Sequence, residues 1–237
     1  MKNNEAIKLA NLRMLQFVAT KLGKLCNDVV FLGGCTTAIF ITDLTSPDVR
    51  YTLDVDCIVD IISLHQYHQL ERQLHEHGFK KSPLDEVICR WHYDDAILDV
   101  MPTDEKILGF GNRWYKTAIQ QAVTYLLTDK LPIKIVTAPY FLATKLEAFK
   151  GRGKLDFFAS HDFEDIVSVL DGRVEIIDEV RRSDNQLRNY LAKSFTDIHN
   201  NRFFHDALPG HFVQYGSVAD ERITFFLQKI EQIKQCN

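Results

Sequence analysis

The chain has 237 residues, of which 46% are hydrophobic and 25% charged, as in an ordinary globular protein with a substantial core. No apolar run approaches the roughly 18 residues that a membrane-spanning helix needs, and no signal-peptide pattern is visible at the start, so we expect a cytoplasmic protein without membrane contact. The net charge of −4 gives no overall footprint for nucleic acid, and five cysteines without a C-x-x-C pair argue against a disulfide framework or structural zinc.

The first sixty residues have the pattern of one helix and two strands. Apolar side chains recur at three- to five-residue intervals from Asn4 to about Leu25, which predicts an amphipathic helix. The run Val29–Leu32 stops at Gly33-Gly34, which is typical of a buried strand ending in a tight turn. A second strand is predicted from Thr52 to Ile62.

A capped helix and a hairpin follow. Ser63 and Gln66 have the spacing of a capping box, and Gly78 suits the left-handed end of the helix that they open. Asp94-Asp95 is predicted to form the turn of an antiparallel hairpin. Strands are predicted at 86–93, 96–101 and 133–136.

The character of the sequence changes near Pro139. Beyond this residue the apolar spacing becomes helical and the pattern of strands fades. We therefore predict an α/β (α+β) protein with two parts, which are an α/β domain at 1–137 and a mainly helical domain at 138–237.

Two carboxylates stand on one predicted strand. Because strand side chains alternate between faces, Asp54 and Asp56 point the same way, about 6.6 Å apart along the backbone. Such acids repel each other and are costly to desolvate. A hard divalent cation removes this cost, since Mg²⁺ takes carboxylate and phosphate oxygens as ligands.

A third carboxylate is expected from a neighbouring strand. Asp99 lies inside the apolar run Ala96–Met101, where a buried acid without a partner is hard to justify. Together with Asp54 and Asp56 it could hold two metal ions about 3.5–4 Å apart. Asp94 or Asp95 is an alternative third acid, although a hairpin turn explains both.

The glycine pair supplies a site for phosphate. Gly33 and Gly34 allow the backbone to turn sharply and to approach a ligand closely. Backbone N–H groups at such a turn, or at the start of a helix opened by Thr36 or Thr37, can cradle a phosphate group.

These features resemble a known family. The Gly33-Gly34 turn, the block Arg50-x-Thr52-x-Asp54-x-Asp56 and Asp99 are similar to the DNA polymerase β-type nucleotidyltransferase superfamily, and more specifically to its AbiEii-like branch, the toxins of type IV toxin–antitoxin systems. The resemblance implies a mixed sheet flanked by helices, an NTP as substrate and two Mg²⁺ or Mn²⁺ ions. The sequence departs from the superfamily in the interval between Gly34 and Asp54, which is longer than usual. A loop around Ser46-Pro47-Asp48 is expected to contain the additional residues.

The same branch has a lysine helix followed by a D-x-x-D helix. Here Lys145 matches the first, and Asp162 and Asp165 match the second. The resemblance implies that Lys145 contacts the triphosphate and that the two aspartates orient Lys145 or the nucleotide. From the residues alone, Lys145 is equally explained as a solvated cation near a helix end, and Asp162 as an acid of a first helical turn.

The predicted activity is transfer of a nucleoside monophosphate from an NTP to a hydroxyl group with release of pyrophosphate. The resemblance makes RNA, and tRNA in particular, the first acceptor to consider, and it implies a cognate antitoxin as a partner. A protein hydroxyl or a small molecule such as an aminoglycoside stays open as acceptor. The alternative is a catalytically silent module that binds nucleic acid or an antitoxin.

Overall fold

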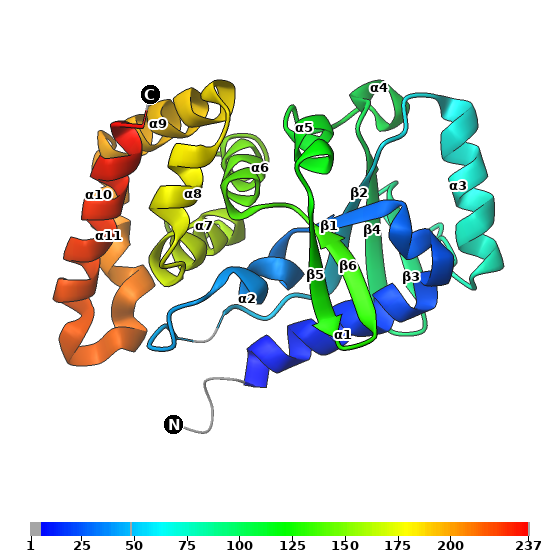
Figure 1. Ribbon diagram of the computed structural model, residues 1–237, viewed down its shortest axis with the longest axis horizontal. Helices are drawn as coiled ribbons and strands as arrows, with labels where there is room; N and C mark the ends of the chain where they lie inside the picture. Colours follow the sequence, from blue (N-terminus) through cyan, green and yellow to red (C-terminus); the bar gives the residue numbers. More distant parts are fainter. Residues whose placement is uncertain (1–5, 48, 237) are drawn as a thin grey trace. The chain divides into compact units, whose positions relative to one another are not determined.

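The computed structural model describes residues 6–47 and 49–236, which divide into two compact units (Figure 1). Unit 1 consists of Met1–Ala38 and Arg50–Thr137, and unit 2 consists of Ile39–Val49 and Ala138–Asn237. Residues 39–49 precede the predicted domain division in sequence but belong to unit 2. The chain therefore passes between the units three times.

Unit 1 is built on a six-stranded mixed sheet with the strand order β3-β4-β2-β1-β6-β5. Within it β2 runs parallel to β4 and β1 parallel to β6, whereas the other neighbours are antiparallel. The predicted class, a mixed sheet with flanking helices, is confirmed. The strands are β1 (Val29–Leu32), β2 (Asp54–Val59), β3 (Arg90–Tyr93), β4 (Ala96–Pro102), β5 (Val123–Thr128) and β6 (Leu131–Ile135).

The central strands carry the core of unit 1. All four residues of β1 are buried, and Phe31 at its centre is fully buried. The edge strand β5 is largely exposed, and Leu126 is 64% accessible. Burial on both faces is what gave β1 its continuous apolar run, whereas the mixed exposure of β5 left no such run to predict it.

The helices of unit 1 are α1 (Ala6–Leu22), α3 (Leu64–Glu76), α4 (Glu105–Leu108) and α5 (Tyr115–Gln120). The prediction of α1 is confirmed from Ala6, and residues 4 and 5 lie outside the described residues. The helix stops at Leu22 because Gly23 adopts φ 55°, and the predicted continuation to Leu25 is the 3-10 helix η1 (Gly23–Asn27).

The predicted caps of α3 are confirmed. The Ser63 hydroxyl accepts a hydrogen bond from the Gln66 backbone N–H, and the Gln66 side chain returns to the Ile62 N–H. At the other end Gly78 has φ 91°, and the Phe79 N–H donates to the carbonyl of Leu74.

The hairpin is confirmed with a shorter first strand. Asp94 adopts φ 50° in the turn, and pairing extends from Tyr93–Ala96 to Arg90–Asp99. The predicted strand residues 86–89 are not in β3, because the chain turns there and the Arg90 N–H donates to the carbonyl of Val87.

Unit 2 is helical, as predicted. Aromatic rings form much of its core: Phe163 packs against Phe149 and Phe157 with ring centroids 5.0 Å apart. No helix of the described residues is long and apolar enough to cross a membrane. The helices are α6 (Ala138–Lys150), α7 (His161–Gly172), α8 (Ile176–Arg182), α9 (Asn185–His199), α10 (Arg202–Ala207), η3 (Leu208–Val218) and α11 (Ala219–Lys234).

The segment 39–49 is fixed to the end of α7. The backbone N–H groups of Thr42 and Asp43 both donate to the carbonyl of Gly172, at 3.0 and 2.9 Å. The Asp43 carboxylate pairs with Arg222 of α11 at 2.6 Å, and Arg222 also pairs with Asp171 at 2.8 Å. This segment is thus part of unit 2 through both its backbone and its charge. Asp48, in the loop predicted here, lies outside the described residues.

Candidate active site

The three predicted carboxylates lie on neighbouring strands. Asp54 and Asp56 are on β2, and the parallel register of β2 and β4 places Asp56 directly opposite Asp99. Val55 and Cys57 alternate onto the other face of the sheet and are fully buried. The three acids therefore share one face of the sheet, at which Asp99 is 6% exposed.

Gly33 makes room for the Asp56 carboxylate. It directly follows Leu32, the residue paired with Asp56, and has φ 79°. A β carbon on Gly33 would lie 1.9 Å from Oδ2 of Asp56, which is far inside van der Waals contact. A β carbon on Gly34 would lie 2.4 Å from Nη2 of Arg50. Close approach of Asp56 therefore requires glycine at position 33, whereas the atom nearest Gly34 is the far end of the flexible Arg50 side chain, which can shift.

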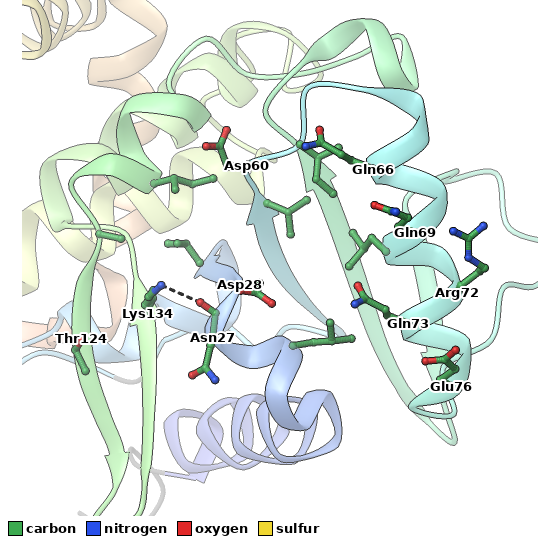
Figure 2. A pocket seen from close by; sticks show the side chains of 17 residues that line it. Asn27, Asp28, Asp60, Gln66, Gln69, Arg72, Gln73, Glu76, Thr124 and Lys134 are labelled. Carbon is green, nitrogen blue, oxygen red and sulfur yellow. Dashed lines mark hydrogen bonds between the residues drawn. The ribbon is translucent and has the colours of Figure 1, made fainter.

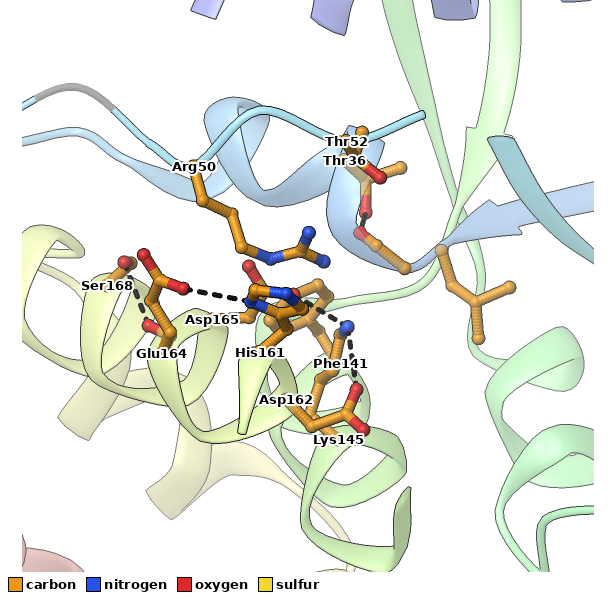
Figure 3. Close-up of polar contacts among 12 residues, drawn as sticks. Thr36, Arg50, Thr52, Phe141, Lys145, His161, Asp162, Glu164, Asp165 and Ser168 are labelled. Carbon is orange, nitrogen blue, oxygen red and sulfur yellow. Dashed lines mark hydrogen bonds and ion pairs between the residues drawn. The ribbon is translucent and has the colours of Figure 1, made fainter. Parts of the chain in front are cut away.

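The turn after Gly33 is tighter than the predicted helix start. Gly34–Thr36 forms the 3-10 helix η2, and the helix α2 that follows (Thr37–Phe40) has only four residues. The Thr36 hydroxyl donates to the carbonyl of Gly33 at 2.9 Å, so it stabilises the turn (Figure 3). The structure therefore places a tight turn, and not the N-terminus of a long helix, after β1.

The segment that leads into β2 is held by a buried residue of α1 that the sequence analysis did not identify. Asn11 is fully buried; its amide N–H donates to the carbonyl of Arg50 at 2.9 Å, and its carbonyl accepts from the Thr52 N–H at 3.3 Å. The Thr52 hydroxyl then donates to Oδ1 of Asp54 at 3.0 Å. One amide side chain thereby positions the first catalytic carboxylate candidate.

Arg90 is the second residue that the sequence analysis missed. Its Nε and Nη2 donate to the two oxygens of Asp99 at 2.9 and 2.8 Å, and Nη2 also reaches Oδ2 of Asp54 at 3.1 Å. The hydrogen bonds from the guanidinium to Asp99 raise the pKa of Arg90 further above its ordinary range, so it stays charged. The sequence contained a signal for this contact, because a hairpin with a two-residue turn at Asp94-Asp95 places Arg90 opposite Asp99.

The donor set suits a hard cation, with one obstacle. Three carboxylates on one face of adjacent strands are the oxygen ligands that Mg²⁺ and Mn²⁺ prefer. Among the described residues, however, no group of three or more His, Cys, Asp or Glu side chains is gathered closely enough to hold a metal ion. In addition, the Arg90 guanidinium contacts oxygens of both Asp54 and Asp99.

Thiol chemistry is disfavoured near the carboxylates. The described cysteines are all buried, and none of them forms a disulfide. Burial, with the nearby aspartates, raises the pKa of Cys57 well above its usual value and that of Cys89 to about 12. Protonated thiols are poor nucleophiles and poor metal ligands, so the site depends on oxygen donors.

Lys145 occupies a buried ion-pair cluster in unit 2. It is only 5% exposed, and its ammonium lies 3.0 Å from Oδ1 of Asp162 and 2.7 Å from Oδ2 of Asp165 (Figure 3). A solvated cation near a helix end, the bland alternative for this residue, is therefore wrong. Asp162 lies in the first turn of α7, which agrees with its interpretation as an acid of a first helical turn. It also pairs with Arg152.

The electrostatics of this cluster favour the charged forms. Burial opposes ionisation of Asp162, but the hydrogen bond from Arg152 and the charges of Lys145 and Arg152 outweigh burial and lower its pKa to about 2. Asp162 is therefore a carboxylate at neutral pH, and Lys145 faces two acids across a buried contact.

A groove of about 920 Å³ lies elsewhere in unit 1, and none of the three carboxylates lines it. Figure 2 shows it between α3 and the strands β5 and β6. Its polar lining includes Gln66, Gln69 and Gln73 of α3, together with Lys134 on β6, which donates to the carbonyl of Asn27 at 2.8 Å. Charged groups line it as well, among them Asp28, Asp60, Arg72 and Glu76. The groove is thus distinct from the carboxylate site.

No protein-family model matches this chain, and no curated protein matches it. Among solved structures it is similar to an antigenic nucleotidyltransferase-like protein from Paracoccidioides brasiliensis, with a TM-score of 0.46 and 19% identity over 79% of this chain and 88% of that chain. It is also similar to the antibiotic-resistance factor ANT(2'')-Ia, with a TM-score of 0.45 and 11% identity over 68% of this chain and 83% of that chain.

Proposed function

We propose that the protein is a metal-dependent nucleotidyltransferase, which moves a nucleoside monophosphate from an NTP to a hydroxyl group. The observation that carries the proposal is the register of the two parallel strands, which sets Asp56 opposite Asp99 with Asp54 on the same face. Next to these acids the Gly33 turn is shaped around a carboxylate. Acids held together in this way are costly unless a positive charge compensates them.

The residues divide the reaction between them. Asp54 and Asp56 would hold two Mg²⁺ or Mn²⁺ ions, which supply Lewis acidity to the phosphates and to the leaving pyrophosphate. Asp99 would accept the proton of the acceptor hydroxyl as its oxygen bonds to the α-phosphorus and the bond to pyrophosphate breaks. The backbone of Gly33, Gly34 and Thr36 would hold the triphosphate.

The cluster in unit 2 would contribute to nucleotide binding. Lys145 would add positive charge for the triphosphate, while Asp162 and Asp165 hold its ammonium in one place. Because two carboxylates already balance this charge, we expect a smaller attraction for phosphate than a lone buried lysine would exert.

The acceptor proposed first is RNA, with tRNA as the leading candidate, and a toxin role with a cognate antitoxin follows from the AbiEii-like resemblance. The Arg50-x-Thr52-x-Asp54-x-Asp56 block supports this branch, because Arg50 and Thr52 both contact the glycine turn. A protein or small-molecule hydroxyl is the competing acceptor.

The test is transfer of label from each NTP to total RNA in the presence of Mg²⁺. We expect labelled RNA with the wild-type protein and none with the double variant Asp54→Asn/Asp56→Asn, since both metal-binding charges are lost. The matched control is Asp94→Asn, because Asn tolerates the left-handed turn conformation and Asp94 lies outside the carboxylate face. Full transfer by the double variant would refute the assignment.

A further inference from the structure

We propose that Arg90 competes with a divalent cation for the oxygens of Asp99 and Asp54, which its guanidinium contacts and must release when such a cation binds. This inference rests on the proposed function, because it assumes that these acids are the metal ligands. It adds a residue that sets the metal affinity of the site and makes it weak in the absence of nucleotide.

The contacts of the two acids leave little room for a cation as they stand. Oδ1 and Oδ2 of Asp99 accept from Nε and Nη2 of Arg90, and Oδ2 of Asp54 accepts from Nη2. The remaining oxygen of Asp54 accepts from the Thr52 hydroxyl. All four carboxylate oxygens of this pair are therefore engaged, three of them by one guanidinium.

Because both are positively charged, the Arg90 guanidinium and a metal ion compete for the same carboxylate oxygens. A guanidinium bonded to a carboxylate through two N–H groups is among the strong polar contacts in proteins. A divalent cation at the same oxygens would stand a few ångströms from this permanent positive charge and be repelled by it. The site can bind the ion only after the guanidinium has moved or at the cost of that repulsion.

The fold allows the side chain to move while its backbone stays in place. Arg90 is paired with Asp99 across β3 and β4, and its neighbour Trp91 is 1% exposed on the opposite face. The Arg90 side chain itself is 23% exposed. It can therefore turn toward solvent by rotation about its own bonds and return when the ion leaves.

The test counts free Mn²⁺ by electron paramagnetic resonance during titration of the protein without NTP. We expect Arg90→Gln to bind Mn²⁺ about tenfold or more tightly than the wild type, because charge-assisted contacts of the acids no longer compete. The control is Lys81→Gln, which removes one positive charge from the same unit, where Lys81 pairs with Glu71 at 2.5 Å. This control should leave Mn²⁺ affinity unchanged.

Further variants keep the test decisive. Arg90→Lys retains the charge but cannot span both acids, so its Mn²⁺ affinity should lie between those of the wild type and Arg90→Gln, and it serves alone if Arg90→Gln does not fold. Adding Asp54→Asn to Arg90→Gln should abolish the gain. Thermal unfolding of each variant checks that the fold is retained.

The outcomes separate this inference from the proposed function. If Arg90→Gln binds Mn²⁺ no more tightly than the wild type, or more weakly, Arg90 does not compete and the inference is overturned while the metal site survives. If neither the wild type nor the folded Arg90 variants bind Mn²⁺ at millimolar concentration, the proposed function fails and the inference fails with it.

Discussion

Gly33 combines two constraints in a single residue. Its φ of 79° is unfavourable for any residue with a β carbon, and that β carbon would also overlap Oδ2 of Asp56. Gly109 has nearly the same φ, 78°, but nothing lies within 4 Å of where its β carbon would stand. The two glycines differ in ψ as well: Gly109, at ψ 4°, is in the left-handed helical region, whereas Gly33, at ψ −171°, is in a region that essentially only glycine adopts.

Gly33→Ala is therefore expected to cost more than Gly109→Ala. Gly109→Ala should lose about 1–2 kcal/mol of unfolding free energy through strain. Gly33→Ala should lose about 3 kcal/mol or more, because its backbone conformation is closed to alanine and the Asp56 side chain must also move. Urea denaturation measures both. Equal losses would mean that the turn tolerates a β carbon at Gly33 and does not fix the position of Asp56.

At the scale of single residues, local spacing in the sequence predicted which side chains share a face, but it could not predict contacts between residues far apart in the chain. Asp54 and Asp56 share a face because alternation is a property of any strand. Asn11 could not be recognised as their support, since its contacts to Arg50 and Thr52 join residues about forty positions apart. Arg90 was within reach, because a hairpin register follows from its turn.

Helices α6 and α7 are joined by the charges of Lys145, Asp162 and Asp165, all of them buried. Lys145→Met keeps the length of the side chain but leaves two buried carboxylates without the ammonium. We expect a loss of about 3–5 kcal/mol of unfolding free energy.

Lys150 on the same helix is the control for this substitution. It is exposed and donates to the Ser194 hydroxyl at 2.8 Å, so Lys150→Met should cost about 1 kcal/mol or less. Denaturation and NTP titration of both variants separate stability from binding. Wild-type stability in Lys145→Met would show that the ion pairs contribute little net energy.

The ion pairs between these two helices should make the stability of the protein depend on pH. Because the pKa of Asp162 is about 2 in the folded protein and 3.8 in its ordinary state, its ionised form stabilises the fold above about pH 4. This contribution is lost as the pH falls toward 2. Between pH 7 and pH 3 the wild type should lose about 1 kcal/mol more than Asp162→Asn in urea denaturation; parallel losses would contradict the assignment.

Elements with strong local signals were predicted, and elements without them were not. The capping box of α3 and the turn at Asp94 are written in a few adjacent residues. The strand β5 and the short helices α4 and α5 depend on what they pack against. The parallel pairing of Asp56 with Asp99 joins strands that no short turn connects, so the sequence could not fix its register.

On the scale of the whole molecule, Arg222 supplies ion pairs that help to hold residues 39–49 in unit 2, beside the backbone bonds to Gly172. Arg222→Ala removes the guanidinium that pairs with both Asp43 and the buried Asp171. We expect a loss of about 3 kcal/mol of unfolding free energy, together with faster hydrogen exchange at the Thr42 and Asp43 amides.

Arg181→Ala is the matched control for Arg222→Ala. Its guanidinium makes an exposed pair with Asp178, so the substitution should cost less than about 1 kcal/mol and leave those amides protected. Unchanged exchange in Arg222→Ala would mean that the backbone bonds to Gly172 hold the segment without the ion pairs.

The passage of an early segment into the late unit has a consequence for synthesis on the ribosome. Ser46 and Arg222, which share a hydrogen bond, are 176 residues apart. At about 5–20 residues per second, roughly 10–35 seconds separate their emergence. Helix α7 emerges late in this interval and α11 only at its end, while the strands β1 and β2 on either side of Ile39–Val49 can already pair. Slower translation therefore lengthens the time for which this early segment is exposed to proteases and chaperones. It does not lengthen the exposure of the C-terminal helices to which the segment binds.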